Sequence, residues 1–233
     1  MVSPPGAHAK VPLVEPREAA ANAAVELIQP GMTIGLGSGR AVWAVAERLE
    51  PGTPVVVASE LTRERAEAAG LGLRELDGTF ELDLAIDGAD EIDPSLGLIK
   101  GGGGALLREK IVISAARRFV VVAEASKKVS RLGEGFRLPV EVVRFGWADT
   151  RRRLASLLPD AALRAGDDGS APYVTDEGHY ILDCAIPADT DPATLDAALA
   201  PIPGVVEHGL FLDMASLALL GSDDGNVERL GGR

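Results

Sequence analysis

The chain of 233 residues carries 23 basic and 35 acidic side chains, which gives a formal net charge of −12 at pH 7. This balance disfavours a general nucleic-acid binder, because phosphate backbones select for basic surfaces, and 46% hydrophobic with 25% charged residues is typical of a folded globular protein. The single cysteine, Cys184, excludes an internal disulfide framework, and no run reaches the ~18 apolar residues of a membrane helix. We therefore expect a cytoplasmic protein without membrane association.

The first half of the sequence alternates short apolar runs with helical patterns. Strands are predicted over 32–36, 55–58, 82–86 and 119–123, and helices over 19–29, 42–49, 62–69 and 105–116. Such alternation implies right-handed crossovers and a largely parallel sheet. The sequence predicts a doubly wound, Rossmann-like α/β domain over residues 1–132.

The rhythm changes after Leu132. The pattern predicts a strand over 138–144, a helix over 149–158, a hairpin of 173–176 with 180–184, a helix over 192–200 and a strand at 205–206. That order is ferredoxin-like. We expect a smaller ferredoxin-like α+β domain over residues 133–208, followed by a C-terminal segment, 209–233, that returns to the first domain.

A glycine-rich turn, residues 35–41, joins the first predicted strand to a helix. Glycines let the backbone approach an anion, and a helix N-terminus offers free N–H groups, although such turns also exist for tight packing alone. A dinucleotide fingerprint fails here because Arg40 occupies its third glycine position. Glu60, 23 residues beyond Gly37, could still face a ribose, so an NAD or S-adenosylmethionine enzyme remains an alternative.

An acidic turn follows the predicted strand 82–86. Four carboxylates in seven residues, 87–93, repel one another unless a cation, a proton or ligand hydroxyls offset the repulsion. Magnesium or calcium would suit oxygen ligands, but the calcium-loop spacing is absent, and three histidines with one cysteine do not make a closed zinc site. A polyol substrate and a solvated turn are the other interpretations.

Four consecutive glycines, 101–104, stand between Lys100 and a predicted helix. Ordering them is entropically costly, which suggests that the backbone itself cradles a ligand. Glu109, early in that helix, could reach the loop and serve as a general base once desolvated. The alternative is that Arg108, Glu109 and Lys110 form an ordinary charged helix face.

In this order and spacing, the three segments resemble ribose-5-phosphate isomerase of the A type. The similarity is carried by Gly-Leu-Gly-Ser-Gly at 35–39, Ile-Asp-Gly-Ala-Asp-Glu-Ile-Asp at 86–93 and Leu-Ile-Lys-Gly-Gly-Gly-Gly-Ala-Leu-Leu-Arg-Glu-Lys at 98–110. Residues 126–127, 138–142, 180–183 and 204–211 also look like that family. The resemblance spans roughly Ala19 to Leu230.

The resemblance implies an aldose-ketose isomerase of the pentose phosphate pathway, acting on ribose 5-phosphate and ribulose 5-phosphate through a cis-enediolate without metal or organic cofactor. It makes Glu109 the base, Asp87 and Asp90 the groups that hold sugar hydroxyls and shuttle their protons, and Lys100 the stabiliser of oxygen charge. The substrate-binding residues it implies are Ser38, Gly39, Arg40, Ala41, Gly88, Ala89, Gly101, Gly102, Gly103 and Lys127. It also implies a homo-oligomer, a dimer or a tetramer.

The glycine turn departs from the family pattern. The family usually shows Gly-Thr-Gly-Ser-Thr, whereas residues 37–41 read Gly-Ser-Gly-Arg-Ala, so two hydroxyls are lost at Arg40 and Ala41. Arg40 could replace them with a bidentate phosphate contact, or point to solvent. A sugar-phosphate-binding relative with an altered substrate or lost turnover is therefore the second hypothesis for this chain.

Overall fold

The computed structural model describes residues 15–166 and 168–232. The first fourteen residues of the predicted N-terminal domain lie outside this part of the chain. Within the described residues, none of the helices has the length and hydropathy needed to span a bilayer.

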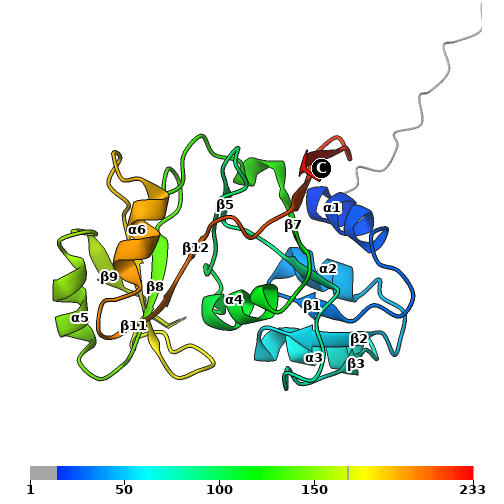
Figure 1. The fold of residues 1–233 in the computed structure, drawn as a ribbon, viewed down its shortest axis with the longest axis horizontal. Coiled ribbons are helices and arrows are strands. Elements are labelled where there is room, and N and C mark those ends of the chain that lie inside the picture. The colour runs from blue at the N-terminus through cyan, green and yellow to red at the C-terminus, as the bar shows by residue number, and fades with distance from the viewer. Residues whose placement is uncertain (1–14, 167, 233) are drawn as a thin grey trace, which may run out of the picture.

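A seven-stranded sheet forms the centre of the larger part of the molecule (Figure 1). Its spatial order is β14 (Val227–Gly231), β13 (Leu217–Gly221), β7 (Phe119–Glu124), β4 (Leu84–Asp87), β1 (Ile34–Leu36), β2 (Pro54–Val57) and β3 (Gly72–Leu73). Every neighbouring pair is parallel except β13 with β14. The predicted parallel α/β sheet is confirmed, whereas β3 and the antiparallel edge strand β14 were not predicted.

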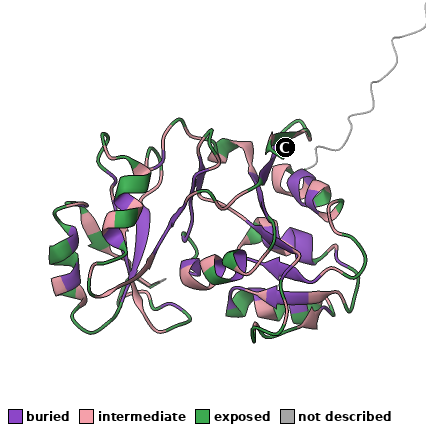
Figure 2. Ribbon diagram, in the orientation of Figure 1, coloured by how far each residue is buried: buried purple, intermediate pink, exposed green. Residues whose placement is uncertain are grey.

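Helices cover both faces of this sheet. They are α1 (Pro16–Val25), α2 (Arg40–Ala46), α3 (Glu60–Ala68) and α4 (Leu106–Ser114). Along β7, Val120 and Val122 pack in the cluster that contains α1 and α2, while Phe119 and Val121 pack in the cluster that contains α4. Successive side chains of β7 thus pack into apolar layers on opposite faces of the sheet. The central strands are buried (Figure 2).

The second unit is a four-stranded antiparallel sheet with two helices. Its elements are β8 (Leu138–Val142), α5 (Trp147–Leu154), β9 (Ala161–Leu163), β10 (Tyr180–Cys184), α6 (Pro192–Leu199) and β11 (Val205–His208), with strand order β11-β8-β10-β9. This is the predicted βαββαβ succession, so an α/β fold with a smaller second domain is confirmed. Cys184 is a free, buried thiol in its core.

One predicted strand is wrong. Residues 173–176 are not in a strand, and the antiparallel neighbour of β10 is instead β9. The side chains of Tyr173 and Thr175 are engaged elsewhere, with the Gly103 carbonyl and with Glu141. Tertiary contacts therefore override the strand propensity of these residues.

A third, three-stranded sheet connects the two units. Its order is β12 (Leu210–Phe211), β6 (Leu98–Ile99) and β5 (Glu91–Ile92), with both pairs antiparallel. The chain passes from β11 through β12 to β13, which lies beside β7 (Figure 1). The residue bounds 1–132, 133–208 and 209–233 stay a prediction.

Candidate active site

A cavity of about 220 Å³ lies at the carboxyl ends of the neighbouring strands β1, β4 and β7. In open α/β sheets this is where ligands bind. All ten residues predicted to bind substrate line this cavity, and so do Asp90, Lys100 and Glu109. Asp87 is the exception: it is fully buried and is not part of the cavity lining.

Three ionisable side chains converge where Lys100 and Glu109 line the cavity. Lys100 Nζ lies 2.7 Å from Asp87 Oδ2 and 3.2 Å from Glu109 Oε2, and it donates to the Gly88 carbonyl oxygen at 2.8 Å. The side chains of Asp87, Lys100 and Glu109 are 0%, 3% and 6% exposed. A cation is thus held between two carboxylates out of water, where electrostatic interactions are strong.

Burial has the largest effect on the pKa values of Asp87, Lys100 and Glu109. Burial, followed by the charge of Asp87, raises the pKa of Glu109 to about 8, although Lys100 acts in the opposite direction. Burial likewise raises the pKa of Asp87 against the lowering effect of Lys100. Burial alone would lower the pKa of Lys100, but the two carboxylates outweigh it and the pKa is raised. The lysine is therefore a permanent cation beside a carboxyl group that titrates above neutrality.

The glycine turn makes room for Asp87. A Cβ at Gly37 would stand 1.8 Å from Asp87 Cγ, so only glycine lets the end of β1 approach this carboxylate. Asp87 Oδ1 accepts from the backbone N–H groups of Ser38 at 3.1 Å and Gly88 at 2.7 Å. Gly37 thus has a packing role, and Gly39, with a positive φ of 104°, precedes the first residue of α2.

The four acidic side chains of residues 87–93 each have their own partners. Asp90 Oδ2 accepts from Gly102 N–H at 2.8 Å, and Glu91 accepts from three backbone N–H groups of residues 133–136. Asp93 accepts from residues 95 and 97 in its own turn. Among the described residues, no group of three or more His, Cys, Asp or Glu is placed to hold a metal ion. Their mutual repulsion is thus relieved within the protein.

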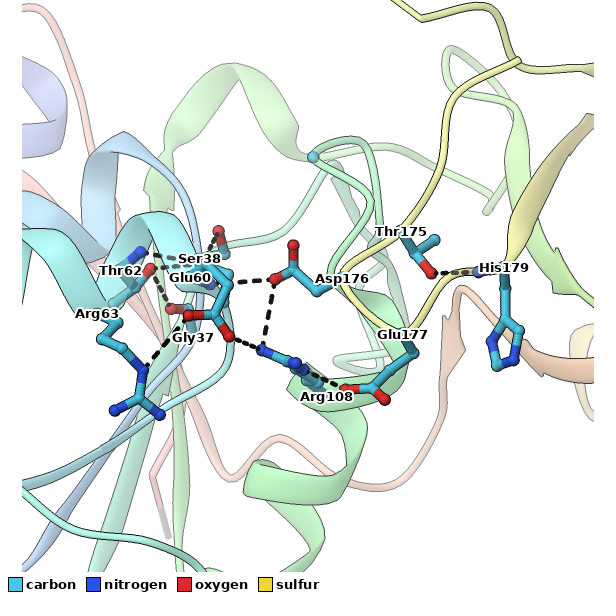
Figure 3. A network of polar contacts seen from close by, with 12 residues as sticks. Gly37, Ser38, Glu60, Thr62, Arg63, Arg108, Thr175, Asp176, Glu177 and His179 are labelled. Atoms are coloured by element: carbon cyan, nitrogen blue, oxygen red, sulfur yellow. Dashed lines mark hydrogen bonds and ion pairs between the residues drawn. The ribbon is translucent and has the colours of Figure 1, made fainter.

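Glu60 takes part in a polar network that joins the two domains (Figure 3). Arg108 Nη1 lies 2.7 Å from Glu60 Oε1, and Arg108 Nε lies 2.6 Å from Glu177 Oε1. Asp176 Oδ2 accepts from the Glu60 backbone N–H at 3.1 Å. The bond from Arg108 lowers the pKa of Glu60. Because Glu60 does not line the cavity and is paired with Arg108, the structure favours a surface carboxylate at the start of α3 over a ribose contact.

Sequence reasoning missed part of the cavity lining. Arg17, at the start of α1, lines the cavity together with Val122, Ala123 and Glu124 of β7. In the sequence, the rest of α1 lies between Arg17 and the glycine turn. Arg17 reaches the site only because α1 packs on β7. No local motif marks it. With Arg40, Lys100 and Lys127 it brings four cationic side chains to the cavity of an acidic protein.

Comparisons with known proteins agree with this geometry. The family model "Ribose 5-phosphate isomerase A (phosphoriboisomerase A)" matches residues 54–225. Ribose-5-phosphate isomerase A of Roseiflexus castenholzii is 52% identical over 220 residues, 91% of this chain and 94% of the relative. The ribose 5-phosphate isomerase A structure from Methanocaldococcus jannaschii is 35% identical with a TM-score of 0.85, covering 93% of this chain and 98% of its own.

A D-ribose-5-phosphate isomerase solved in complex with phospho-erythronic acid is 33% identical with a TM-score of 0.86, covering 93% of this chain and 97% of its own. Sequence and structure thus match over nearly the whole of both chains. The chain belongs to the ribose 5-phosphate isomerase A family.

Proposed function

We propose that this chain interconverts D-ribose 5-phosphate and D-ribulose 5-phosphate, with Glu109 moving the proton between C2 and C1. The observation that carries the proposal is the buried Glu109 carboxyl group, which lines the cavity 3.2 Å from Lys100. A carboxyl group desolvated in this way, with a pKa near the working pH, is suited to general base catalysis.

In the proposed reaction, a named side chain moves each proton or neutralises the developing charge. Glu109 takes the C2 proton of the open-chain aldose, the C1 carbonyl oxygen becomes the enediolate oxygen, and Lys100 neutralises its charge. Glu109 then delivers the proton to C1, while Asp90 relays a proton from O2 to O1, which leaves the ketose. Asp87, which is fully buried 2.7 Å from Lys100 Nζ, holds this lysine in place, and the hydroxyl contact that the resemblance implies stays a prediction.

The phosphate is assigned to the cationic lining of the cavity. Arg17, Arg40 and Lys127 line it beside Ser38, whose hydroxyl lies 3.0 Å from Ser59 Oγ. Arginine offers two parallel donors to a phosphate, and lysine a point charge. Local cations thus offset the overall charge of −12 for a phosphorylated sugar.

The deciding experiment is the conversion of ribose 5-phosphate to ribulose 5-phosphate by the purified protein with excess EDTA present. Turnover is the expected result, since the proposed steps use only side chains of the chain. A folded protein without turnover would overturn the proposal. In that case, a rise in melting temperature with pentose phosphates would favour the second hypothesis, a sugar-phosphate-binding relative.

The pH dependence of kcat/KM reports the free enzyme's base. Because the raised pKa of Glu109 keeps its proton bound up to about 8, the base form increases with pH, and kcat/KM is expected to rise about tenfold between pH 7 and 9. The substrate phosphate is already ionised in this range, with its second pKa near 6. Initial rates at low substrate check this, with circular dichroism at each pH as the control. A plateau extending below pH 6 would contradict it.

Arg40→Ala tests the phosphate assignment. Arg40 is exposed at the cavity, and within the described part of the chain no other side chain pairs with its guanidinium. If Arg40 holds phosphate, KM for ribose 5-phosphate is expected to rise about tenfold with little change in kcat, as for one lost charge-assisted bond. Arg40→Lys, which keeps the charge, should retain part of the affinity. An unchanged KM in Arg40→Ala would place this side chain in solvent.

The proposal also includes a cytoplasmic location and a homodimer or tetramer. The only cysteine, Cys184, is unpaired and buried, which suits a reducing compartment. The homo-oligomer is supported by the resemblance to the family, since a single exposed aromatic side chain such as Phe145, 93% exposed, is normal on a monomer. Light scattering during size-exclusion chromatography measures the oligomeric state directly.

A further inference from the structure

Two side chains of the small domain hold the tetraglycine loop, residues 101–104. Arg164, which directly follows β9, donates from Nη1 to the carbonyl oxygens of Gly101 at 2.9 Å and Gly102 at 3.2 Å. Tyr173 Oη donates to the Gly103 carbonyl oxygen at 3.1 Å. Three consecutive carbonyl groups of a loop that lines the cavity therefore face the small domain.

Asp183 on β10 fixes the guanidinium of Arg164. Its carboxylate accepts from Arg164 Nε at 2.9 Å and from Nη2 at 2.5 Å, a bidentate pair. The two side chains are only 14% and 24% exposed. A planar fork held at two points has a defined orientation, so Nη1 is directed at the loop before any substrate binds.

The planar geometry of the peptide group fixes where the N–H groups of the loop point. In a trans peptide the N–H of one residue points opposite to the C=O of the preceding residue, and the described peptide bonds include no cis bond. Because the Gly101 carbonyl oxygen accepts a hydrogen bond from Arg164, the Gly102 N–H points the other way. It donates to Asp90 Oδ2 at 2.8 Å. With the Gly102 carbonyl on Arg164, the Gly103 N–H is likewise directed away from the small domain.

We propose that Arg164 is a positioning residue for the isomerisation. It holds two peptide groups so that the Gly102 N–H fixes Asp90 and the Gly103 N–H meets the enediolate oxygen, an inference that rests on the proposed function. A cation on a carbonyl oxygen also polarises the peptide and strengthens its N–H as a donor. Donors fixed toward a developing oxyanion stabilise the transition state more than the ground state. The small domain thereby acts on the reaction without touching the substrate.

Arg164→Ala separates this role from a merely structural one. Because oriented donors act in the transition state, kcat is expected to fall about 10²-fold while KM for ribose 5-phosphate stays within about threefold. Arg164→Lys keeps the charge without the fork, so its kcat should lie between the two. Millimolar guanidinium should restore part of the kcat of Arg164→Ala, since it occupies the space between Asp183 and the loop.

Arg137→Ala is the matched control. Arg137 is also an arginine of the small domain, and it donates to the carbonyl oxygens of Asp160 and Asp183 and pairs with the Asp160 carboxylate at 3.0 Å. Among the described residues it has no bond to the tetraglycine loop, so kcat is expected within about twofold of wild type. The proposal is overturned if folded Arg164→Ala keeps kcat within about threefold, if its loss lies in KM alone, or if Arg137→Ala loses as much.

A second readout does not depend on turnover. Amide hydrogen exchange at Gly102 and Gly103, followed by NMR, is expected to accelerate at least about tenfold in Arg164→Ala, while the amides of β1 are unchanged. Unchanged exchange at the loop would overturn the role of Arg164 even in an active enzyme. An inactive wild type would overturn the proposed function, and the exchange rates would still decide whether Arg164 orders the loop. If Arg164→Ala fails to fold, Arg164→Lys gives the same two readouts.

Discussion

Glu109→Gln is expected to lower kcat by about 10⁴-fold, the upper end of what a positioned general base contributes. The amide has nearly the same shape as the carboxyl group, but it cannot take a proton from carbon. Stability should be retained, because the amide keeps the shape of a buried side chain that is already mostly protonated below pH 8, while Lys100 keeps its contact with Asp87. Steady-state kinetics and thermal melting followed by circular dichroism measure the two effects.

Glu141→Gln is the control for this change. Glu141 is another buried carboxyl group whose pKa is raised by burial, but it lies in the small domain, bonded to Thr175 and His179. It does not line the cavity, so its kcat should stay within about threefold of wild type. The Glu109 variant should also fail to exchange substrate protons with D₂O. Retention of more than about a tenth of wild-type kcat would remove Glu109 from the role of base.

The parallel sheet was predictable because its strands bury both faces. Runs such as Phe119–Ala123 are apolar without interruption, which is typical of a strand between two helical layers. The edge strand β14 was not predicted, because its residues are partly exposed and carry Glu228 and Arg229. Strand β9 has only three small or half-buried residues, so its pairing with β10 had no pattern to indicate it.

The site was predictable where its residues are local to a strand end or a glycine loop. The sequence between positions 87 and 109 contains Asp87, Lys100 and Glu109. Their charges and the glycines near them indicate a site from the sequence alone. Packing between distant segments alone brings Arg17 to the cavity and Arg164 to the tetraglycine loop. A lone arginine in a helix or after a short strand looks like any solvated residue, so its role emerges only from the tertiary structure.

Asp87 shows how burial changes the meaning of a motif. The resemblance implies that it holds sugar hydroxyls, which stays a prediction. The structure shows the side chain fully buried, 2.7 Å from Lys100 Nζ. A buried carboxylate paired with a buried lysine keeps that lysine charged and fixed in place. Asp87 thus helps to hold a charged Lys100 at the cavity. The charged state of Lys100 depends on both Asp87 and Glu109.

Lys100→Met is therefore expected to reduce both activity and stability. Loss of the cation that neutralises the enediolate should lower kcat by about 10³-fold. Two buried carboxyl groups would also lose their partner, which typically costs about 3–5 kcal/mol of unfolding free energy. Without Lys100, burial raises the pKa values of Asp87 and Glu109 further above those of the unfolded chain. Stability is then retained at low pH and lost as the pH rises through the folded values.

Urea unfolding of Lys100→Met should accordingly show a larger loss of stability at about pH 8.5 than at about pH 6, because protonated carboxyl groups need no cation. Lys110→Met is the matched control on the same stretch of chain, since Lys110 pairs with Glu207 at 2.7 Å and does not line the cavity. It should lose stability but keep kcat within about threefold. A Lys100→Met enzyme that is equally destabilised at both pH values would show that Asp87 and Glu109 do not depend on this lysine, and a kcat near wild type would remove Lys100 from the chemistry.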